Sequence, residues 1–184
     1  MASISWPAGP PSFYADVFFL RKTLLNGTVL TVDPSSGSVG SMPGFAVHKQ
    51  GKLVKSGIIE ISLGTAGKPA LPHRRFLELF AKLRAILPQS PDVLLVEQIG
   101  TKVHHLLLEA VGVTIVGANT PNVIRVHNQI WKAFTRAMPG YVKGDSADAL
   151  AMAEVTMLAA KLLDEKQYDE FPEEALKLIK PKYR

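Results

Sequence analysis

Two short apolar runs, each ending in a carboxylate, place the strongest constraint on the fold. Residues 28–32 are rich in β-branched side chains and are followed by Asp33, and residues 93–96 are continuously apolar and are followed by Glu97. Short apolar runs of this kind are typical of strands that are buried within a sheet. We therefore predict two such strands. If they are neighbours, their carboxyl ends bring the two carboxylates together.

The segments around these runs predict a mixed α/β sheet covered by helices. Residues 44–48 and 52–62 are expected to form two strands joined by a turn at Gln50 and Gly51, so that the first three strands make an antiparallel meander. Alternating helices and strands then follow along the chain. Helices are expected over residues 13–25, 72–87, 104–117, 128–138 and 146–163, and a further strand over residues 123–126.

The length of the chain bounds the number of domains. With 184 residues, of which 47% are apolar, the chain suits one well-cored domain with tails. We expect an N-terminal tail and short helix over residues 1–27, the α/β domain over 28–165, and a basic tail over 166–184. The apolar run at residues 17–20 is too short to cross a bilayer, and no basic stretch precedes it. We therefore expect a cytoplasmic protein with no membrane partner.

The carboxylates predict a metal site. The sequence has no cysteine, so any metal would be held by oxygen or imidazole ligands, which favours magnesium or manganese. Asp145 and Asp148 lie three residues apart at the start of the last predicted helix, and hence on one face of it. Clustered carboxylates repel one another unless a cation is present. Two divalent ions held in this way hydrolyse phosphodiesters, and the net charge of +5 suits a polyanionic partner.

Three acidic segments resemble one family in order and spacing. Residues 29–36 together with residues 44–47 are similar to the opening strand, turn and second strand of RuvC-like Holliday junction resolvases, especially the phage-type members. Residues 93–98 are similar to the second acidic strand of that family, and residues 145–151 to its final acidic helix. The resemblance covers roughly residues 28–163. An extra stretch at residues 37–43 departs from the family pattern, as does the absence of a lysine-rich loop before Asp145.

The resemblance implies an RNase H-like fold and a dimeric nuclease that cuts branched DNA, such as a four-way junction, with two magnesium or manganese ions. Asp33, Glu97, Asp145 and Asp148 would be both the catalytic residues and the metal ligands. Further residues are expected to contact nucleic acid at or near this acidic edge. They are Ser35, Ser36, Lys102, Arg125, Lys132 and Lys143. No nucleotide cofactor is expected, because the glycines of residues 64–69 lack the pattern of a phosphate-binding loop.

Other interpretations remain open at this point. Taken alone, Asp33 fits ordinary turn chemistry before Pro34, and Asp145 fits a helix N-cap with Asp148 in the first turn. A nuclease of the same fold that acts on RNA–DNA hybrids or flaps would use the same carboxylates. A non-catalytic DNA-binding protein of this fold would not depend on them. An ATPase of the related actin-like fold would need glycine-rich phosphate loops, which the sequence does not show.

Overall fold

The computed structural model describes residues 11–34, 42–62, 64–65, 68–87, 89–98, 105–136 and 144–165. Its helices are α1 (Pro11–Asn26), α2 (Pro72–Ile86), α3 (His105–Ala118), α4 (Asn128–Arg136) and α5 (Asp145–Glu165). Its strands are β1 (Thr28–Asp33), β2 (Gly44–Lys49), β3 (Lys52–Ile58), β4 (Gly64–Thr65), β5 (Lys68–Pro69), β6 (Val93–Gln98) and β7 (Val123–His127).

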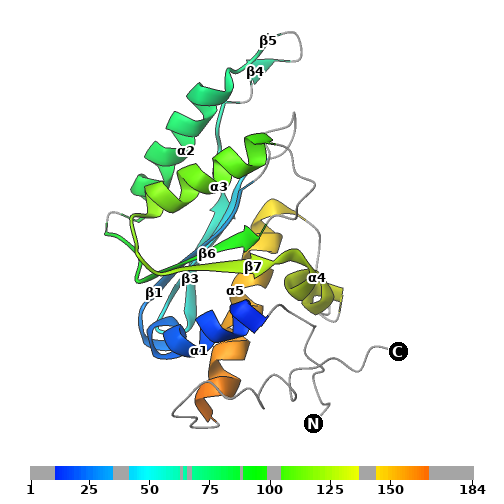
Figure 1. The fold of residues 1–184 in the computed structure, drawn as a ribbon. Coiled ribbons are helices and arrows are strands. Elements are labelled where there is room, and N and C mark those ends of the chain that lie inside the picture. Colours follow the sequence, from blue (N-terminus) through cyan, green and yellow to red (C-terminus); the bar gives the residue numbers. More distant parts are fainter. Residues whose placement is uncertain are drawn as a thin grey trace.

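Five strands form one mixed sheet in the order β3-β2-β1-β6-β7 (Figure 1). β1, β2 and β3 are antiparallel neighbours, whereas β6 runs parallel to β1 and β7 runs parallel to β6. The turn between β2 and β3 uses Gln50 and Gly51 at positive φ angles of 51° and 69°, as a tight hairpin requires. The predicted mixed sheet with its three-strand meander is therefore confirmed, with β1 at its centre.

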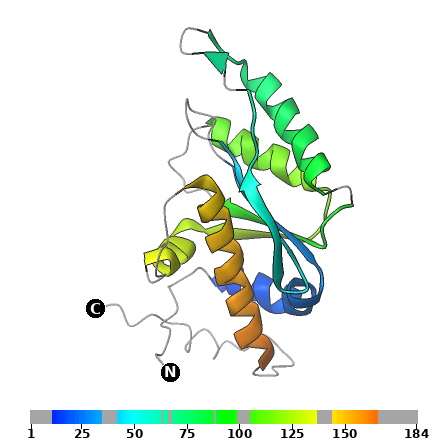
Figure 2. The same cartoon turned by 180° about the vertical axis from the view of Figure 1, so that it is seen from behind.

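Helices cover both faces of this sheet (Figures 1 and 2). On one face, α2 and α3 pack over Leu30, Val32 and Leu94. On the other face, α1, α4 and α5 pack over Val29 and Leu95 together with residues of β7. Because successive side chains of a strand point to opposite faces, the apolar runs in β1 and β6 supply both cores at once.

The predicted third strand was wrong in its length. Residues 52–62 were expected to form one strand, but β3 ends at Ile58. The backbone of Ile59 then donates to the carbonyl of Pro43, and that of Ser62 donates to the Glu78 carboxylate at 2.6 Å. Ile59 and Ile61 are both buried, so their alternation resembles that of a strand although the ladder has ended. The short hairpin of β4 and β5 was not predicted.

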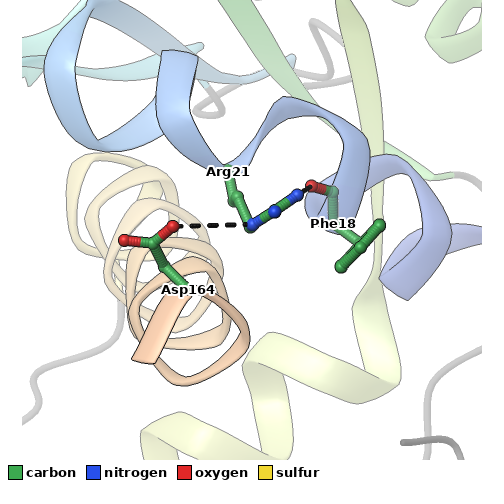
Figure 3. A network of polar contacts seen from close by, with 3 residues as sticks. All are labelled: Phe18, Arg21 and Asp164. Carbon is green, nitrogen blue, oxygen red and sulfur yellow. Dashed lines mark hydrogen bonds and ion pairs between the residues drawn. The ribbon is translucent and has the colours of Figure 1, made fainter. Parts of the chain in front are cut away.

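Helix α1 is part of the core. Phe13, Tyr14, Val17, Phe18 and Leu24 are buried in the same cluster as the residues of α5. A polar contact joins the two helices as well (Figure 3). The Nε atom of Arg21 lies 3.5 Å from the Asp164 carboxylate of α5, and its Nη1 atom donates to the carbonyl of Phe18. The predicted N-terminal helix is confirmed, and it covers the α5 side of the sheet.

The junction between α1 and β1 fixes the start of the central strands. Gly27 is tightly enclosed there, since a Cβ atom would lie 2.7 Å from the Thr23 carbonyl and 2.8 Å from the Asp92 carboxylate. That carboxylate accepts a 2.7 Å hydrogen bond from the backbone of Thr28. Asp92 immediately precedes β6, so the bond ties the starts of β1 and β6 together. Among the helices described, none is long and apolar enough to span a membrane.

Candidate active site

The parallel register of β1 and β6 places Asp33 and Glu97 at equivalent positions. Val32 is paired with Val96, and each carboxylate is the next residue of its strand. Both strands therefore present their carboxylates at the same edge of the sheet. The sequence predicted this juxtaposition only on the condition that the two strands are neighbours. It follows from β1 and β6 being hydrogen-bonded neighbours in the centre of the sheet.

The alternation of side chains decides which face the two carboxylates occupy. Val29 of β1 and Leu95 of β6 both lie in the core beneath α1, α4 and α5. Asp33 and Glu97 have the same parity as these residues, so they face the helix α5 side of the sheet. Asp33 is only 9% exposed, and Glu97 is half-buried.

The first turn of α5 brings a third carboxylate to the same place. Asp148 is 9% exposed, and its backbone N–H donates to the carbonyl of Gly144 at 2.8 Å as the helix begins. Its charge raises the pKa of Glu97, which shows that the two carboxylates are close enough to repel each other. Asp145 is the first residue of α5, but its side chain lies outside the described residues.

The surroundings of Glu97 disfavour the charged form of its carboxyl group. Burial is the main cause that raises the pKa of its carboxyl group, and Asp148 raises it further. The positive charge of Lys132 and the indole N–H of Trp131 act in the opposite direction. The Trp131 side chain is 3% exposed, and its Nε1 atom falls short of a regular hydrogen bond to any described residue. A desolvated carboxylate beside a second one gains stability from a bound cation.

The described side chains do not by themselves complete a metal centre. Among them, no group of three or more histidine, aspartate or glutamate side chains is arranged to hold a metal ion. The donor chemistry nevertheless fits a hard cation, because Asp33, Glu97 and Asp148 offer carboxylate oxygens in a largely buried setting.

Of the residues predicted to contact nucleic acid, the structure describes two, and only one of these lies beside the carboxylates. Lys132 of α4 is exposed and acts on Glu97 electrostatically, so it lies beside the carboxylates. Arg125 of β7 is also exposed, but it shares its face of the sheet with Val123, on the side of α3. The other four lie outside the described residues. They are Ser35, Ser36, Lys102 and Lys143.

The role of Trp131 beside Glu97 was missed from the sequence. Its neighbours Ile130 and Phe134 indicate only that this side of α4 faces a core, and Ile130 is indeed fully buried. Nothing in the spacing of these residues shows that the indole N–H approaches a carboxylate at the end of β6. The contact depends on α4 following β7 directly and folding back against α5.

Comparison with solved structures identifies the architecture. A structure of Thermus thermophilus RuvC in complex with a Holliday junction substrate aligns with 74% of this chain and 95% of its own chain, at a TM-score of 0.53 and 19% identity. The chain has the RuvC fold. A second Thermus thermophilus RuvC structure aligns with 74% of this chain and 96% of its own, at a TM-score of 0.49 and 17% identity. No protein-family model and no curated protein sequence matches the chain.

Proposed function

We propose that this protein is a metal-dependent, structure-specific DNA endonuclease that resolves Holliday junctions or other branched DNA. One observation carries the proposal. The parallel register of β1 and β6 sets Asp33 and Glu97 at the same edge and on the same face of the sheet, where Asp148 of α5 acts on Glu97. The RuvC fold gives this arrangement a context in which a related architecture is seen bound to a four-way junction.

The carboxylates suit two magnesium or manganese ions as cofactors. Asp33, Glu97 and Asp148 would hold them, together with Asp145 from the first turn of α5. When bound, such ions activate a water molecule and stabilise the leaving oxygen of a phosphodiester. The raised pKa of Glu97 reflects a carboxylate whose charge is poorly solvated because the side chain is largely buried. That cost is removed when a cation binds, so the site is disposed to take one up.

The residues of the chain position the DNA around this centre. Lys132 is exposed beside Glu97 and offers an ammonium group to a phosphate next to the scissile bond. Trp131 holds this segment of α4 in the core, and its indole N–H lowers the pKa of Glu97 and so favours the charged form of that carboxylate. Ser35, Ser36, Lys102 and Lys143 remain proposed DNA contacts. The structure describes none of these four.

A homodimer would present two such sites to the matching strands of a junction. The groove between α2 and α3 is the surface that we assign to the second copy. It has a volume of about 610 Å³, and Leu77, Phe80 and Val116 on its walls are 66%, 40% and 68% exposed. α2 exposes basic side chains and α3 exposes Glu109, so a twofold arrangement that packs α2 on the partner's α3 would pair opposite charges.

The dimer is tested by analytical ultracentrifugation. Leu77→Glu places a charge in the groove and should yield a monomer that nicks one strand of a junction at a time. Phe19→Glu is the matched control, because Phe19 is 73% exposed on α1, a helix outside this groove. If both variants and the unchanged protein sediment as dimers, the groove is not the dimer interface.

The nuclease is tested with a panel of labelled substrates. The purified protein is incubated with a four-way junction, a flap, linear duplex DNA and an RNA–DNA hybrid, with and without magnesium or manganese. Symmetric nicking of the junction that requires metal supports a resolvase. Cleavage of flaps or hybrids instead would support the metal-dependent hydrolysis but assign a different substrate to the protein. Binding to DNA without cleavage of any substrate would indicate a non-catalytic DNA-binding protein.

A further inference from the structure

A second cavity lies at the β7 edge of the sheet, next to the candidate active site. It has a volume of about 480 Å³, within the range of small-molecule sites. Its lining comes from α1, β6, α3 and β7, and Figure 1 shows α1 passing beside β7. The lining residues are Ser12, Phe13, Asp16, Gln98, Ile115, Val123 and Arg125.

The polar groups of this cavity select the kind of ligand. Asp16 and Arg125 bring opposite charges, and neither forms an ion pair within the described part of the chain. A purely anionic ligand would be repelled by Asp16, and a purely cationic one by Arg125. Gln98 adds an amide that both donates and accepts. A neutral ligand with donors and acceptors along its edge satisfies all three groups.

The size and the apolar walls favour a flat ring. Phe13, Ile115 and Val123 contribute the apolar part of the lining. Partial burial raises the pKa of Asp16, as expected for a carboxylate that has lost some water without gaining a cationic partner. Such a carboxylate is satisfied by two adjacent N–H donors. Guanine presents this pair on its Watson–Crick edge, while its O6 and N7 atoms are acceptors that suit an arginine.

Strand β6 contributes a residue both to the cavity and to the candidate active site. Gln98 directly follows Glu97, so the two side chains point to opposite faces at adjacent positions of the same strand. A DNA strand held at the carboxylates would reach the cavity by crossing the carboxyl end of β6, where Glu97 and Gln98 are adjacent. An unstacked base is the part of that strand able to turn into a cavity of this size.

We propose that the cavity between α1, α3 and β7 binds a guanine base, with Asp16 accepting from its Watson–Crick edge and Arg125 and Gln98 donating to its acceptors. The base comes either from the DNA strand cut at the neighbouring carboxylates or from a free guanine nucleotide. The first source rests on the proposed nuclease function, and the second does not.

Binding of single nucleotides tests the cavity without any need for cleavage. dGMP, dAMP, dCMP and TMP are titrated into the full-length protein and followed by ligand-observed NMR. We expect dGMP to bind at least about tenfold more tightly than the other three, and Asp16→Asn to remove this preference. Glu165→Gln removes an exposed carboxylate from the far end of α5 and should change nothing. Thermal unfolding of each variant confirms that it is folded.

Cleavage of matched junctions then distinguishes the two sources. The junctions differ only in the base next to the cut, and a preference for guanine that Asp16→Asn abolishes assigns the site to the DNA strand. Guanine-selective binding of the mononucleotides without any such preference assigns it to a free nucleotide. Equal binding of all four nucleotides, an unchanged preference in Asp16→Asn, or no dGMP binding at millimolar concentration would overturn the proposal. None of these results bears on whether the protein is a nuclease.

Discussion

Two adjacent phenylalanines of α1 offer a sharp test of the packing that supports α5. Phe18 is 2% exposed and belongs to the core cluster shared with α5, whereas Phe19 is 73% exposed. Replacing a buried phenylalanine with alanine costs about 3–5 kcal/mol, through lost burial and the cavity that remains. Replacing an exposed one changes stability by about 0.5 kcal/mol or less.

The two substitutions are closely matched. They remove the same atoms from neighbouring positions of one helix, and each removes the edge contact between the two rings, whose centroids are 5.6 Å apart. Phe18→Ala additionally loses the Arg21 guanidinium that lies 4.2 Å from its ring centroid. That difference adds to the expected gap between the variants.

Thermal unfolding measures the gap. The Tm of a protein of this size shifts by roughly 2–4 °C for each kcal/mol of change in the free energy of unfolding. Phe18→Ala should therefore lower the Tm by roughly 6–20 °C, and Phe19→Ala by about 2 °C or less. Equal shifts in the two variants would refute the assignment of α1 to the core. Helix α1 would then be an appended segment outside the core of the domain.

Three further predictions concern charge and metal. As the pH falls, the unchanged protein should lose more stability than the His48→Leu variant, because burial lowers the pKa of His48 from its ordinary 6.5 and only the unfolded chain takes up the proton readily. Urea unfolding should show a loss of up to about 1.4 kcal/mol in the free energy of unfolding for each pH unit below 6.5. Parallel pH profiles for the two proteins would contradict this. Magnesium or manganese at about 100 times its Kd should stabilise the protein by about 2.7 kcal/mol in thermal unfolding, and Asp33→Asn should lose this gain. Trp131→Phe should weaken metal binding by about tenfold or more in calorimetry, because Glu97 loses the N–H that favours its charged form; unchanged affinity would remove Trp131 from the site.

The sequence predicted the central strands well because their constraints are local. Continuous apolar runs have few structural solutions other than an interior strand, and the carboxylate after each run marks where burial ends. The long last helix was equally clear from its alanine and leucine content, predicted over residues 146–163 and observed over Asp145–Glu165. Gly112 and the β-branched residues after it made the end of α3 uncertain in sequence terms. Packing against α2 keeps the helix intact to Ala118, where the Ala118 side chain is buried.

The features that the sequence did not predict depend on contacts between segments that are distant along the chain. Ile59 and Ile61 alternate as in a strand, but the hydrogen bonds from this segment go to Pro43, Met42 and Glu78 rather than to a neighbouring strand. The effect of Trp131 on Glu97 likewise arises only when α4 folds against α5. The parallel pairing of β1 with β6 could be stated only as a condition from the sequence, and it is the observation on which the candidate site depends.

The central claim is that the carboxylates at this edge cut DNA, and separating binding from cutting tests it most directly. Asp33→Asn and Glu97→Gln are compared with Glu165→Gln for binding to a labelled four-way junction without metal and for nicking it with magnesium or manganese. We predict that all three variants bind the junction and that only Glu165→Gln nicks it as the unchanged protein does. Full nicking by Asp33→Asn or Glu97→Gln would contradict the role assigned to that carboxylate.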